Sequence, residues 1–258
     1  MKFRPCIDIH QGVVKQIVGS TLTDEEAPET NFQADKPAEW FASLYRKDKL
    51  AGGHIIQLGK GNEAAARTAL AAWPGGMQIG GGVTLDNAAG WLDAGAGAVI
   101  VTSWVFHDGV VDELRLKSLF HLVGKSRLVL DLSCRRWGAE YRIVTNRWQT
   151  FTEEVITPRL LDYLSAYASE FLVHAVDVEG KCRGIEAPLV EILGKWAKIP
   201  VTYAGGIQSF EDIEQIRDLG NGYIDFTAGS ALDIFGGDKL CYRELVERYG
   251  IGSGQKRR

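Results

Sequence analysis

Hydrophobic residues along the chain fall into two alternating patterns. Short, nearly continuous apolar runs bounded by glycine or polar residues are typical of strands buried on both faces of a parallel sheet. Between them lie longer stretches with apolar residues at helical spacing, such as Trp40, Phe41, Leu44 and Tyr45. The runs predict strands at residues 3–9, 54–58, 77–81, 98–103, 127–133, 171–177, 200–204 and 222–228. The stretches predict helices at residues 36–49, 62–73, 85–94, 111–123, 158–168, 186–198, 209–218 and 238–249.

Strands that regularly alternate with helices in this way indicate an α/β protein with a (β/α)8 barrel, the TIM barrel. No Pro- or Ser-rich linker divides the chain, so we expect one barrel domain over residues 1–258, with a short polar and basic tail at residues 251–258. The alternative is an open, doubly wound sheet. That fold favours a G-x-G-x-x-G sequence after the first strand, which this chain lacks.

The second half of the chain repeats features of the first half. Asp8 and Asp131 each stand near the end of a short apolar strand, and Gly81 and Gly205 follow similar strands at nearly the same sequence offset. The fourth and eighth strands form a third pair with similar ends. Three pairs in one order predict two similar half-barrels. Their bounds are about residues 1–125 and 126–250.

A lone carboxylate at the end of a buried strand requires an explanation, and Asp8 and Asp131 are two such residues. The ends of the first and fifth strands of a barrel face a common mouth, so the two carboxylates would face one another. Paired carboxylates in different surroundings can divide the work of general acid and general base. Asp131 could instead cap the next turn or pair with Arg135 or Arg136. Metal binding by the pair has weak support, and we expect no metal site.

Glycine-rich turns follow the third and seventh strands, and small residues end the fourth and eighth strands. Glycine lets backbone N–H groups approach an anion closely, and barrels commonly bind phosphate after strands 7 and 8. The repeated set predicts two phosphate sites, and therefore a substrate with a phosphate at each end, although the glycines could also serve only as tight turns. The candidate binding residues are Gly81, Gly82, Thr102, Ser103, Gly205, Gly206, Gly229 and Ser230.

Two segments interrupt the regular alternation. Residues 20–35 form a long polar stretch with little periodicity, and loops of this length are often functional lids. Residues 134–154 carry two tryptophans and four arginines directly after the strand that holds Asp131. Within this segment, residues 141–144 and 148–151 could pair as a hairpin at the face where barrel active sites lie.

Composition argues against several classes of protein. A net charge of -4 and a pI near 5.8 provide no general attraction to nucleic acid or to anionic membranes. The four cysteines include no C-x-x-C pair, so we expect reduced thiols in a cytoplasmic protein. No apolar run approaches the roughly 18 residues that span a bilayer, so we expect neither secretion nor a membrane anchor.

These residues resemble an enzyme family of histidine biosynthesis, the phosphoribosylformimino-aminoimidazole carboxamide ribotide isomerases. The resemblance covers about residues 3–250. It rests on Pro-Cys-Ile-Asp at residues 5–8, on Leu130-Asp131, on the Gly-Gly-Gly and Ala-Gly-Gly-Ile turns, and on Gly-Ser-Ala-Leu at residues 229–232. Further segments are similar to the fungal and plant branch of the family, at residues 14–19, 101–104, 131–135 and 232–237.

The resemblance implies an isomerase that needs no cofactor and no partner protein. Members convert an aminoaldose with two ribose phosphates to an aminoketose by an Amadori rearrangement. By the resemblance, Asp131 is the acid that protonates the furanose ring oxygen, and Asp8 is the base that removes the C2 proton. Trp148 matches a family tryptophan that stacks over the substrate when the loop after strand 5 closes, but it could instead be packed core of the hairpin. We expect a monomer that binds a small-molecule substrate with two phosphates, and neither nucleic acid nor membrane.

The chain departs from the family pattern at three places. The bacterial pattern has Asp-Leu-Asp at the end of strand 2, where this chain has Gln57-Leu58-Gly59. The usual arginine after strand 3 is missing, with Thr84 near that place, and a threonine expected after strand 6 is replaced by Ala175. Residues that could compensate, or could instead be structural, are His54, Arg135, His174 and Asp177.

Two related enzymes and one different class of protein are the alternatives. The cyclase subunit of imidazole glycerol phosphate synthase has the same barrel, but its pattern has a lysine where this chain has Gln16, and it works with a glutaminase and ammonia. A bifunctional isomerase that also accepts phosphoribosyl anthranilate would use the same sugar chemistry. A non-catalytic module that binds phosphate ligands is disfavoured, because two carboxylates beside anionic phosphates oppose binding unless they do chemistry.

Overall fold

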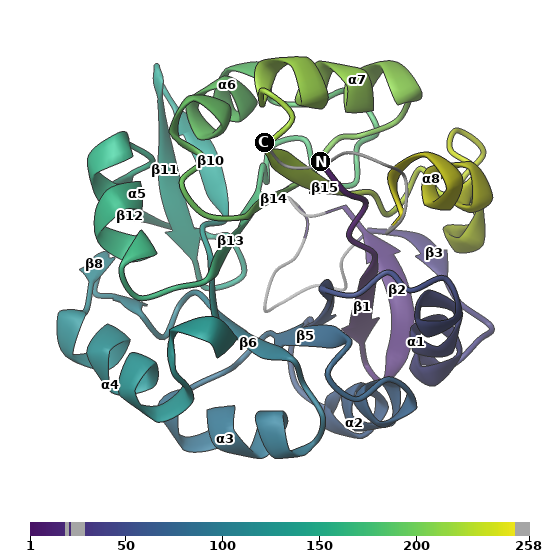
Figure 1. Ribbon diagram of the computed structural model, residues 1–258, viewed down its shortest axis with the longest axis horizontal. Coiled ribbons are helices and arrows are strands. Elements are labelled where there is room, and N and C mark those ends of the chain that lie inside the picture. Colours follow the sequence, from purple (N-terminus) through teal and green to yellow (C-terminus); the bar gives the residue numbers. More distant parts are fainter. Residues whose placement is uncertain (19–20, 22–28, 251–258) are drawn as a thin grey trace.

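Parallel strands curl into a closed barrel, and helices surround it as an outer ring (Figure 1). The computed structural model describes residues 1–18, 21 and 29–250, and the structural statements below concern these residues. The barrel strands, in their order around the barrel, are β1 (Cys6–His10), β4 (Gly53–Gln57), β5 (Met77–Gly80), β6 (Ala98–Val101), β9 (Leu128–Asp131), β13 (Glu170–His174), β14 (Val201–Ala204) and β15 (Ile224–Thr227). The helices are α1 (Ala38–Lys47), α2 (Glu63–Ala72), α3 (Leu85–Asp93), α4 (Glu113–Val123), α5 (Pro158–Ser165), α6 (Ala187–Trp196), α7 (Phe210–Leu219) and α8 (Tyr242–Tyr249). The (β/α)8 barrel expected from the sequence is confirmed.

Strand β15 meets the start of the chain and closes the barrel. Arg4 N donates a hydrogen bond to Phe226 O at 2.8 Å, and Phe226 N donates one to Lys2 O at 3.0 Å. Closure removes the exposed edge that an open sheet would present to solvent. Strands β1 and β9 consequently lie on opposite sides of the barrel.

Local sequence explains where the helices begin. Asp112 accepts a hydrogen bond from Arg115 N at 3.0 Å and so caps the first turn of α4. The first helix, expected from residue 36, begins at Ala38, and Pro37 is the residue that directly precedes it. The last helix, expected from residue 238, begins at Tyr242, because a 3-10 turn at Asp233–Phe235 and the turn after it occupy the preceding segment.

Short strands extend the barrel beside β1. Strand β2 (Val13–Ile17) pairs antiparallel with β1 and with β3 (Thr30–Gln33). A small hairpin of β7 (Phe106–His107) and β8 (Val110–Val111) was not expected. Half of the expected lid at residues 20–35, namely residues 20 and 22–28, lies outside the described residues, as does the tail at residues 251–258.

The segment after β9 forms a separate antiparallel sheet. Its strands are β10 (Cys134–Trp137), β11 (Glu140–Thr145) and β12 (Thr150–Val155). The expected hairpin is confirmed as β11 and β12, but Trp148 lies in the turn between them and not in a strand. Strand β10 was not expected, because its sequence Cys-Arg-Arg-Trp lacks the alternation of a half-buried strand.

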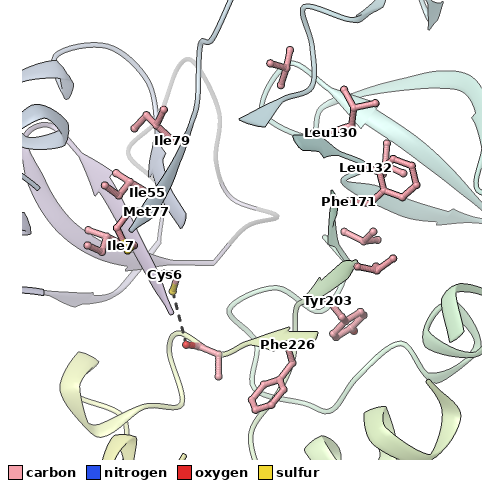
Figure 2. Close-up of a cluster of buried hydrophobic side chains, with 14 of the residues drawn as sticks. Cys6, Ile7, Ile55, Met77, Ile79, Leu130, Leu132, Phe171, Tyr203 and Phe226 are labelled. Carbon is pink, nitrogen blue, oxygen red and sulfur yellow. Dashed lines mark hydrogen bonds between the residues drawn. The ribbon is translucent and has the colours of Figure 1, made fainter. Parts of the chain in front are cut away.

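Two hydrophobic layers hold the barrel together. The larger layer lies between strands and helices, and Figure 2 shows strand residues that belong to it, among them Ile7 and Phe171. The smaller layer consists of Ala98, Ile100, Val129 and Leu172. Side chains alternate between the two faces of a strand, so Asp131 and His174, each two residues beyond a member of the smaller layer, face the barrel interior.

Paired charges close the end of the barrel opposite the mouth. Asp225 is fully buried and accepts a hydrogen bond from Arg4 Nε at 3.1 Å. Glu170 accepts hydrogen bonds from Gln78 Nε2 at 3.0 Å and from Thr202 Oγ1 at 2.8 Å. Arg4 also lies 3.8 Å from Glu170, so one guanidinium joins both carboxylates. Among the described residues, no helix is both long and apolar enough to cross a membrane.

Candidate active site

The carboxyl ends of the barrel strands line two cavities. The Asp8 cavity has a volume of about 30 Å³ and is lined by Asp8, Gly205, Gly229 and neighbouring residues. The Asp131 cavity has a volume of about 1020 Å³ and is lined by Asp131, Gly81 and neighbouring residues. The structure therefore places each predicted catalytic aspartate in a cavity at the mouth of the barrel, beside one of the two glycine-rich turns.

Asp131 ends β9, and three neighbours hold its side chain. Ser133 Oγ donates a hydrogen bond to Asp131 Oδ1 at 2.8 Å, and His174 Nδ1 lies 3.3 Å from the same oxygen. Thr102 adds a further side-chain hydrogen bond. Burial by itself raises the pKa of Asp131, but the positive charge of His174 and these hydrogen bonds hold the pKa below its usual value. Asp131 is therefore ionised at neutral pH.

The turn between β11 and β12 carries Trp148 to the Asp131 cavity. Trp148 Nε1 donates a hydrogen bond to Ser133 Oγ at 2.9 Å, and the indole ring centre lies 5.8 Å from that of His174. Asn146, Arg147 and Trp148 have φ values of 51°, 56° and 67°, a left-handed conformation that is costly for residues with side chains. Trp148 thus forms part of the cavity wall, held there by a strained turn.

Asp8 projects from β1, on the opposite side of the barrel. Gln16 on the neighbouring strand β2 donates a hydrogen bond from Nε2 to Asp8 Oδ2 at 3.2 Å. Burial and the nearby Glu179 carboxylate raise the pKa of Asp8 to about 7, against the opposing effects of His174 and of the Gln16 hydrogen bond. A carboxylate with this pKa can take up a proton near neutral pH, which is what a general base requires.

The loop after β13 closes over the Asp8 cavity. Gly180 in this loop packs so tightly on β2 that a Cβ atom there would lie 2.4 Å from Ile17 O. Asn31 Nδ2 donates hydrogen bonds to Gly180 O at 2.8 Å and to Ser230 Oγ at 3.1 Å. The remaining volume of about 30 Å³ accommodates about one water molecule. The loop after β13 therefore forms a wall of the Asp8 cavity.

His174, at the end of β13, lines both cavities. Burial by itself lowers the pKa of His174, but the charge and hydrogen bond of Asp131, with the charges of Glu179 and Asp8, raise it to about 9. The ring of His54 lies 6.1 Å from that of His174. Burial and the positive charge of His174 lower the pKa of His54 to about 3, so His54 is neutral.

Both glycine turns contain two successive residues with positive φ. The φ values are +86° and +74° at Gly81 and Gly82, and +123° and +74° at Gly205 and Gly206, all in the left-handed region that favours glycine. A Cβ atom on Gly81 would lie 2.1 Å from Gln57 O, so the turn after β5 admits no side chain there. One turn lines the Asp131 cavity and the other lines the Asp8 cavity.

The remaining binding candidates divide between the same two cavities. Thr102 and Ser103 line the Asp131 cavity, where Ser103 Oγ accepts a hydrogen bond from Asn146 N at 3.1 Å. Gly229 and Ser230 line the Asp8 cavity. The structure thus brings the candidates together in two clusters, one in each half of the barrel.

Arg135 and Asp177 pair with one another and lie outside the walls of both cavities. Arg135 Nε lies 2.9 Å from Asp177 Oδ1, and Arg136 N donates a hydrogen bond to Asp177 Oδ2 at 2.8 Å. This ion pair fastens β10 to the loop after β13. Any support that these residues give to the site is therefore indirect, through the position of that loop and of the hairpin sheet.

The structure shows which contacts are made at the three places where the sequence departs from the family pattern. Gln57 Nε2 donates a hydrogen bond to Gly81 O at 3.2 Å and so supports the glycine turn. Thr84 forms a capping box at the start of α3. At the end of β13, the side chain that reaches the cavities is that of His174, whereas Ala175 packs in the layer between barrel and helices.

The sequence did not indicate the roles of three residues of the site: Ser133, Glu179 and Thr227. Ser133 stands two positions after Asp131, so strand alternation could have placed the two side chains together. Glu179 is a lone carboxylate beside a glycine, and no local signal shows that its loop folds over Asp8. Thr227 Oγ1 is buried beside the Cys6 thiol and has no nitrogen or oxygen partner among the described residues.

The chemistry of the site residues is that of acids, bases and hydrogen-bond donors. Across the described ranges, no group of three or more His, Cys, Asp or Glu side chains is arranged to hold a metal ion. The cysteines at positions 6, 134, 182 and 241 are free thiols. The site thus holds a carboxylate with a pKa near 7 at the Asp8 end and a protonated imidazole beside Asp131 at the other end.

Comparisons with known proteins point to one family. A family profile described as "Histidine biosynthesis protein" matches residues 2–237. A protein of Medicago truncatula, named 1-(5-phosphoribosyl)-5-((5-phosphoribosylamino)methylideneamino) imidazole-4-carboxamide isomerase, chloroplastic, is 53% identical over 253 residues, which cover 95% of this chain and 81% of that protein. The isomerases of the same chemical name from Yarrowia lipolytica and Neurospora crassa are 48% and 47% identical, and each alignment covers 95% of this chain and 97% of the relative.

Proposed function

Because the chain belongs to the histidine biosynthesis protein family, we propose that it is the isomerase of this family. It converts the aminoaldose N'-(5-phosphoribosyl)formimino-5-aminoimidazole-4-carboxamide ribonucleotide to the corresponding aminoketose. The relatives that carry the name of this isomerase match nearly the whole chain. The observation that carries the proposal is that Asp8 and Asp131 project from opposite strands into two cavities, each beside a glycine turn.

The proposed reaction is an Amadori rearrangement, an internal exchange of oxidation level that consumes no external oxidant or reductant. Ring opening requires a proton on the furanose oxygen, and the following step requires a base at C2. Asp8, with a pKa near 7, supplies the base. The proton comes from the opposite end of the site, where Asp131, Ser133 and His174 form one hydrogen-bonded group.

The substrate's two phosphates bind in the two clusters of small residues. Backbone N–H groups at a glycine turn and at the following helix N-terminus attract anions. One phosphate binds at Gly81, Gly82, Thr102 and Ser103. The other binds at Gly205, Gly206, Gly229 and Ser230. Thr227 Oγ1 has no nitrogen or oxygen partner among the described residues, which supports a polar ligand in the Asp8 cavity, because buried hydroxyl groups rarely remain without such a hydrogen bond.

Gln16 favours the isomerase over the related cyclase. An uncharged amide holds Asp8 without adding a positive charge beside it. A lysine at this position would stabilise the ionised form of Asp8, lower its pKa and make it a weaker base. The pKa of Asp8 near 7 is consistent with the absence of such a charge.

The cellular location and the domain organisation of the enzyme are proposed from the same features. Free cysteines are typical of a reducing compartment, which supports a cytoplasmic location, whereas the Medicago relative is named as chloroplastic. The matching glycine turns support a single barrel built from two similar halves.

The test is conversion of purified aminoaldose by the protein alone, without ammonia, partner or added metal. The proposal expects the aminoketose as the product. If the aminoaldose is unchanged, and a cyclised product forms when aminoketose and ammonia are supplied instead, the protein is the cyclase and the proposal is wrong.

A further inference from the structure

We propose that His174 delivers the proton that opens the furanose ring, and that Asp131 positions His174 for this step. This inference rests on the proposed isomerase function and identifies its proton donor. His174 lines the Asp8 cavity and the Asp131 cavity together. A residue in both walls can reach the middle of a substrate whose two phosphates occupy the two cavities.

The hydrogen bonds around Asp131 make it an acceptor. Ser133 Oγ accepts a hydrogen bond from Trp148 Nε1 at 2.9 Å and uses its own proton to donate to Asp131 Oδ1 at 2.8 Å. Thr102 adds another hydrogen bond, and His174 Nδ1 lies 3.3 Å from Oδ1. Several donors that converge on one carboxylate are typical of an ionised group. Asp131 therefore has no proton of its own to give.

The same contacts define the state of the imidazole. Because Ser133 donates to Asp131, the proton between His174 and Asp131 belongs to His174 Nδ1. The hydrogen bond at Nδ1 fixes the orientation of the ring and therefore the direction in which Nε2 points. His174 Nε2 makes no hydrogen bond with any residue that the structure describes, so it is available to a ligand.

Charged groups from several elements keep this imidazole protonated. It faces Asp131 of β9, Asp8 of β1 and Glu179 of the loop after β13, together with neutral His54 of β4. The three carboxylates outweigh the effect of burial, and the pKa of His174 is about 9. Protonated His174 is thus the group at the Asp131 end that can release a proton at neutral pH.

Protons and electrons balance over the cycle. His174 Nε2–H protonates the ring oxygen, the C1–O bond breaks with its electron pair on oxygen, and the attached nitrogen forms an iminium with C1. Asp8 removes the C2 proton, and the released electron pair forms the C1=C2 bond of the enolamine. Asp8 then returns its proton to C1, while neutral His174 takes up the proton that leaves the C2 hydroxyl as the ketone forms. Both residues regain their starting states.

The first test is the pH dependence of His174→Gln. Glutamine can still donate a hydrogen bond to Asp131 but cannot release a proton, so we expect kcat to fall about 10²- to 10⁴-fold with KM little changed. The loss of activity above about pH 9 that the pKa of His174 predicts for the wild type should disappear. His121→Gln, at an exposed position on α4, is the matched control and should keep the wild-type rate and profile. A His174→Gln enzyme with wild-type kcat and the wild-type alkaline limb would overturn the inference.

The second test uses no activity. The chain has five histidines, so 13C-labelled imidazole gives five Cε1–H signals in an NMR titration. The His174 signal is assigned by its loss in His174→Gln or by its nuclear Overhauser contacts to Trp148. Its midpoint should lie near 9 in the wild type and fall by about 1 to 3 units in Asp131→Asn. A midpoint at the ordinary value of about 6.5, or one unchanged in Asp131→Asn, would contradict the inference.

The inference and the proposed function fail in different ways. A wild-type protein that does not convert the aminoaldose would overturn the function. An active wild-type enzyme whose His174→Gln variant keeps its rate would overturn only the role of His174.

Discussion

Trp148 Nε1 donates a hydrogen bond to Ser133 Oγ at 2.9 Å, and Ser133 Oγ donates in turn to Asp131 Oδ1 at 2.8 Å. The turn of the hairpin sheet is thereby connected to the acid–base group by two successive hydrogen bonds. A change in the position of this turn would alter the donors around Asp131 as well as the shape of its cavity. We therefore expect the position of the turn between β11 and β12 to affect the protonation of the site.

Two substitutions of Trp148 separate the effect of its N–H donor from the effect of its aromatic ring. Trp148→Phe keeps an aromatic ring but removes the N–H donor, and the loss of one hydrogen bond should lower kcat/KM about 2- to 10-fold. Trp148→Ala also removes the ring that would stack on substrate, so the loss should be larger, about 10- to 100-fold, mainly through KM. Trp137→Phe in the same sheet, where Trp137 is 55% exposed, is the control and should behave as wild type. Wild-type kinetics in Trp148→Ala would make Trp148 purely structural.

Asp8→Asn should bind substrate but lose turnover. The amide has the shape of the carboxylate and can still contact Gln16, but it cannot accept the C2 proton, so kcat should fall about 10²- to 10⁴-fold. Isothermal titration measures the retained affinity, and product analysis measures the lost rate. Asp108→Asn, whose side chain is 86% exposed in the wild type, should leave both unchanged. Turnover at the wild-type rate in Asp8→Asn would remove Asp8 from the mechanism.

Gln16→Met should shift the acid limb of the pH profile of kcat/KM to higher pH. The hydrogen bond from Gln16 stabilises ionised Asp8 and lowers its pKa, so its removal raises that pKa above about 7. Less Asp8 is then unprotonated at pH 7, and kcat/KM should fall there but recover at higher pH. Gln33→Met, at an exposed position on the neighbouring strand β3, tests for general effects of the substitution. An acid limb that stays at the wild-type pH in Gln16→Met would show that the amide does not tune Asp8.

Arg4→Met should destabilise the barrel. The substitution leaves Asp225 and Glu170 without the guanidinium between them, and removal of one partner from a buried charge pair costs about 3–5 kcal/mol. Urea unfolding followed by circular dichroism measures the free energy of unfolding. Lys195→Ala removes an exposed helical ion pair and should change this free energy by only about 0.5 kcal/mol. A loss in Arg4→Met as small as that in the control would show that the charges at the closed end are solvated.

The regular succession of short apolar runs and helical stretches explains why the sequence predicted so much of the barrel. Each strand is a short apolar run between polar turns, and the aspartates stand at the ends of such runs. The sequence alone therefore places Asp8 and Asp131 at the mouth of the barrel. The glycine turns could be placed for the same reason, since they directly follow predicted strands. These features depend on residues within a few positions of one another.

The contacts that the sequence did not predict join distant segments or depend on register. A shift of one residue at the end of β13 decides whether His174 or Ala175 faces the interior, and local patterns leave such register open. Glu179 reaches Asp8 only because its loop packs against β2 and Asn31, about 150 residues earlier in the chain. The left-handed turn at Trp148 contains no glycine that would have indicated it.

The most direct test of acid–base catalysis by the two ends of the site is the pH dependence of kcat/KM for isomerisation of the aminoaldose by the wild-type protein. Asp8 must be unprotonated to act, so the rate should rise as pH increases through about 7. The donor at the Asp131 end must be protonated, so the rate should fall as pH increases through about 9. The profile should be bell-shaped with its maximum between these values, whereas a rate that is independent of pH across both would rule out the roles proposed for Asp8 and for the donor at the Asp131 end.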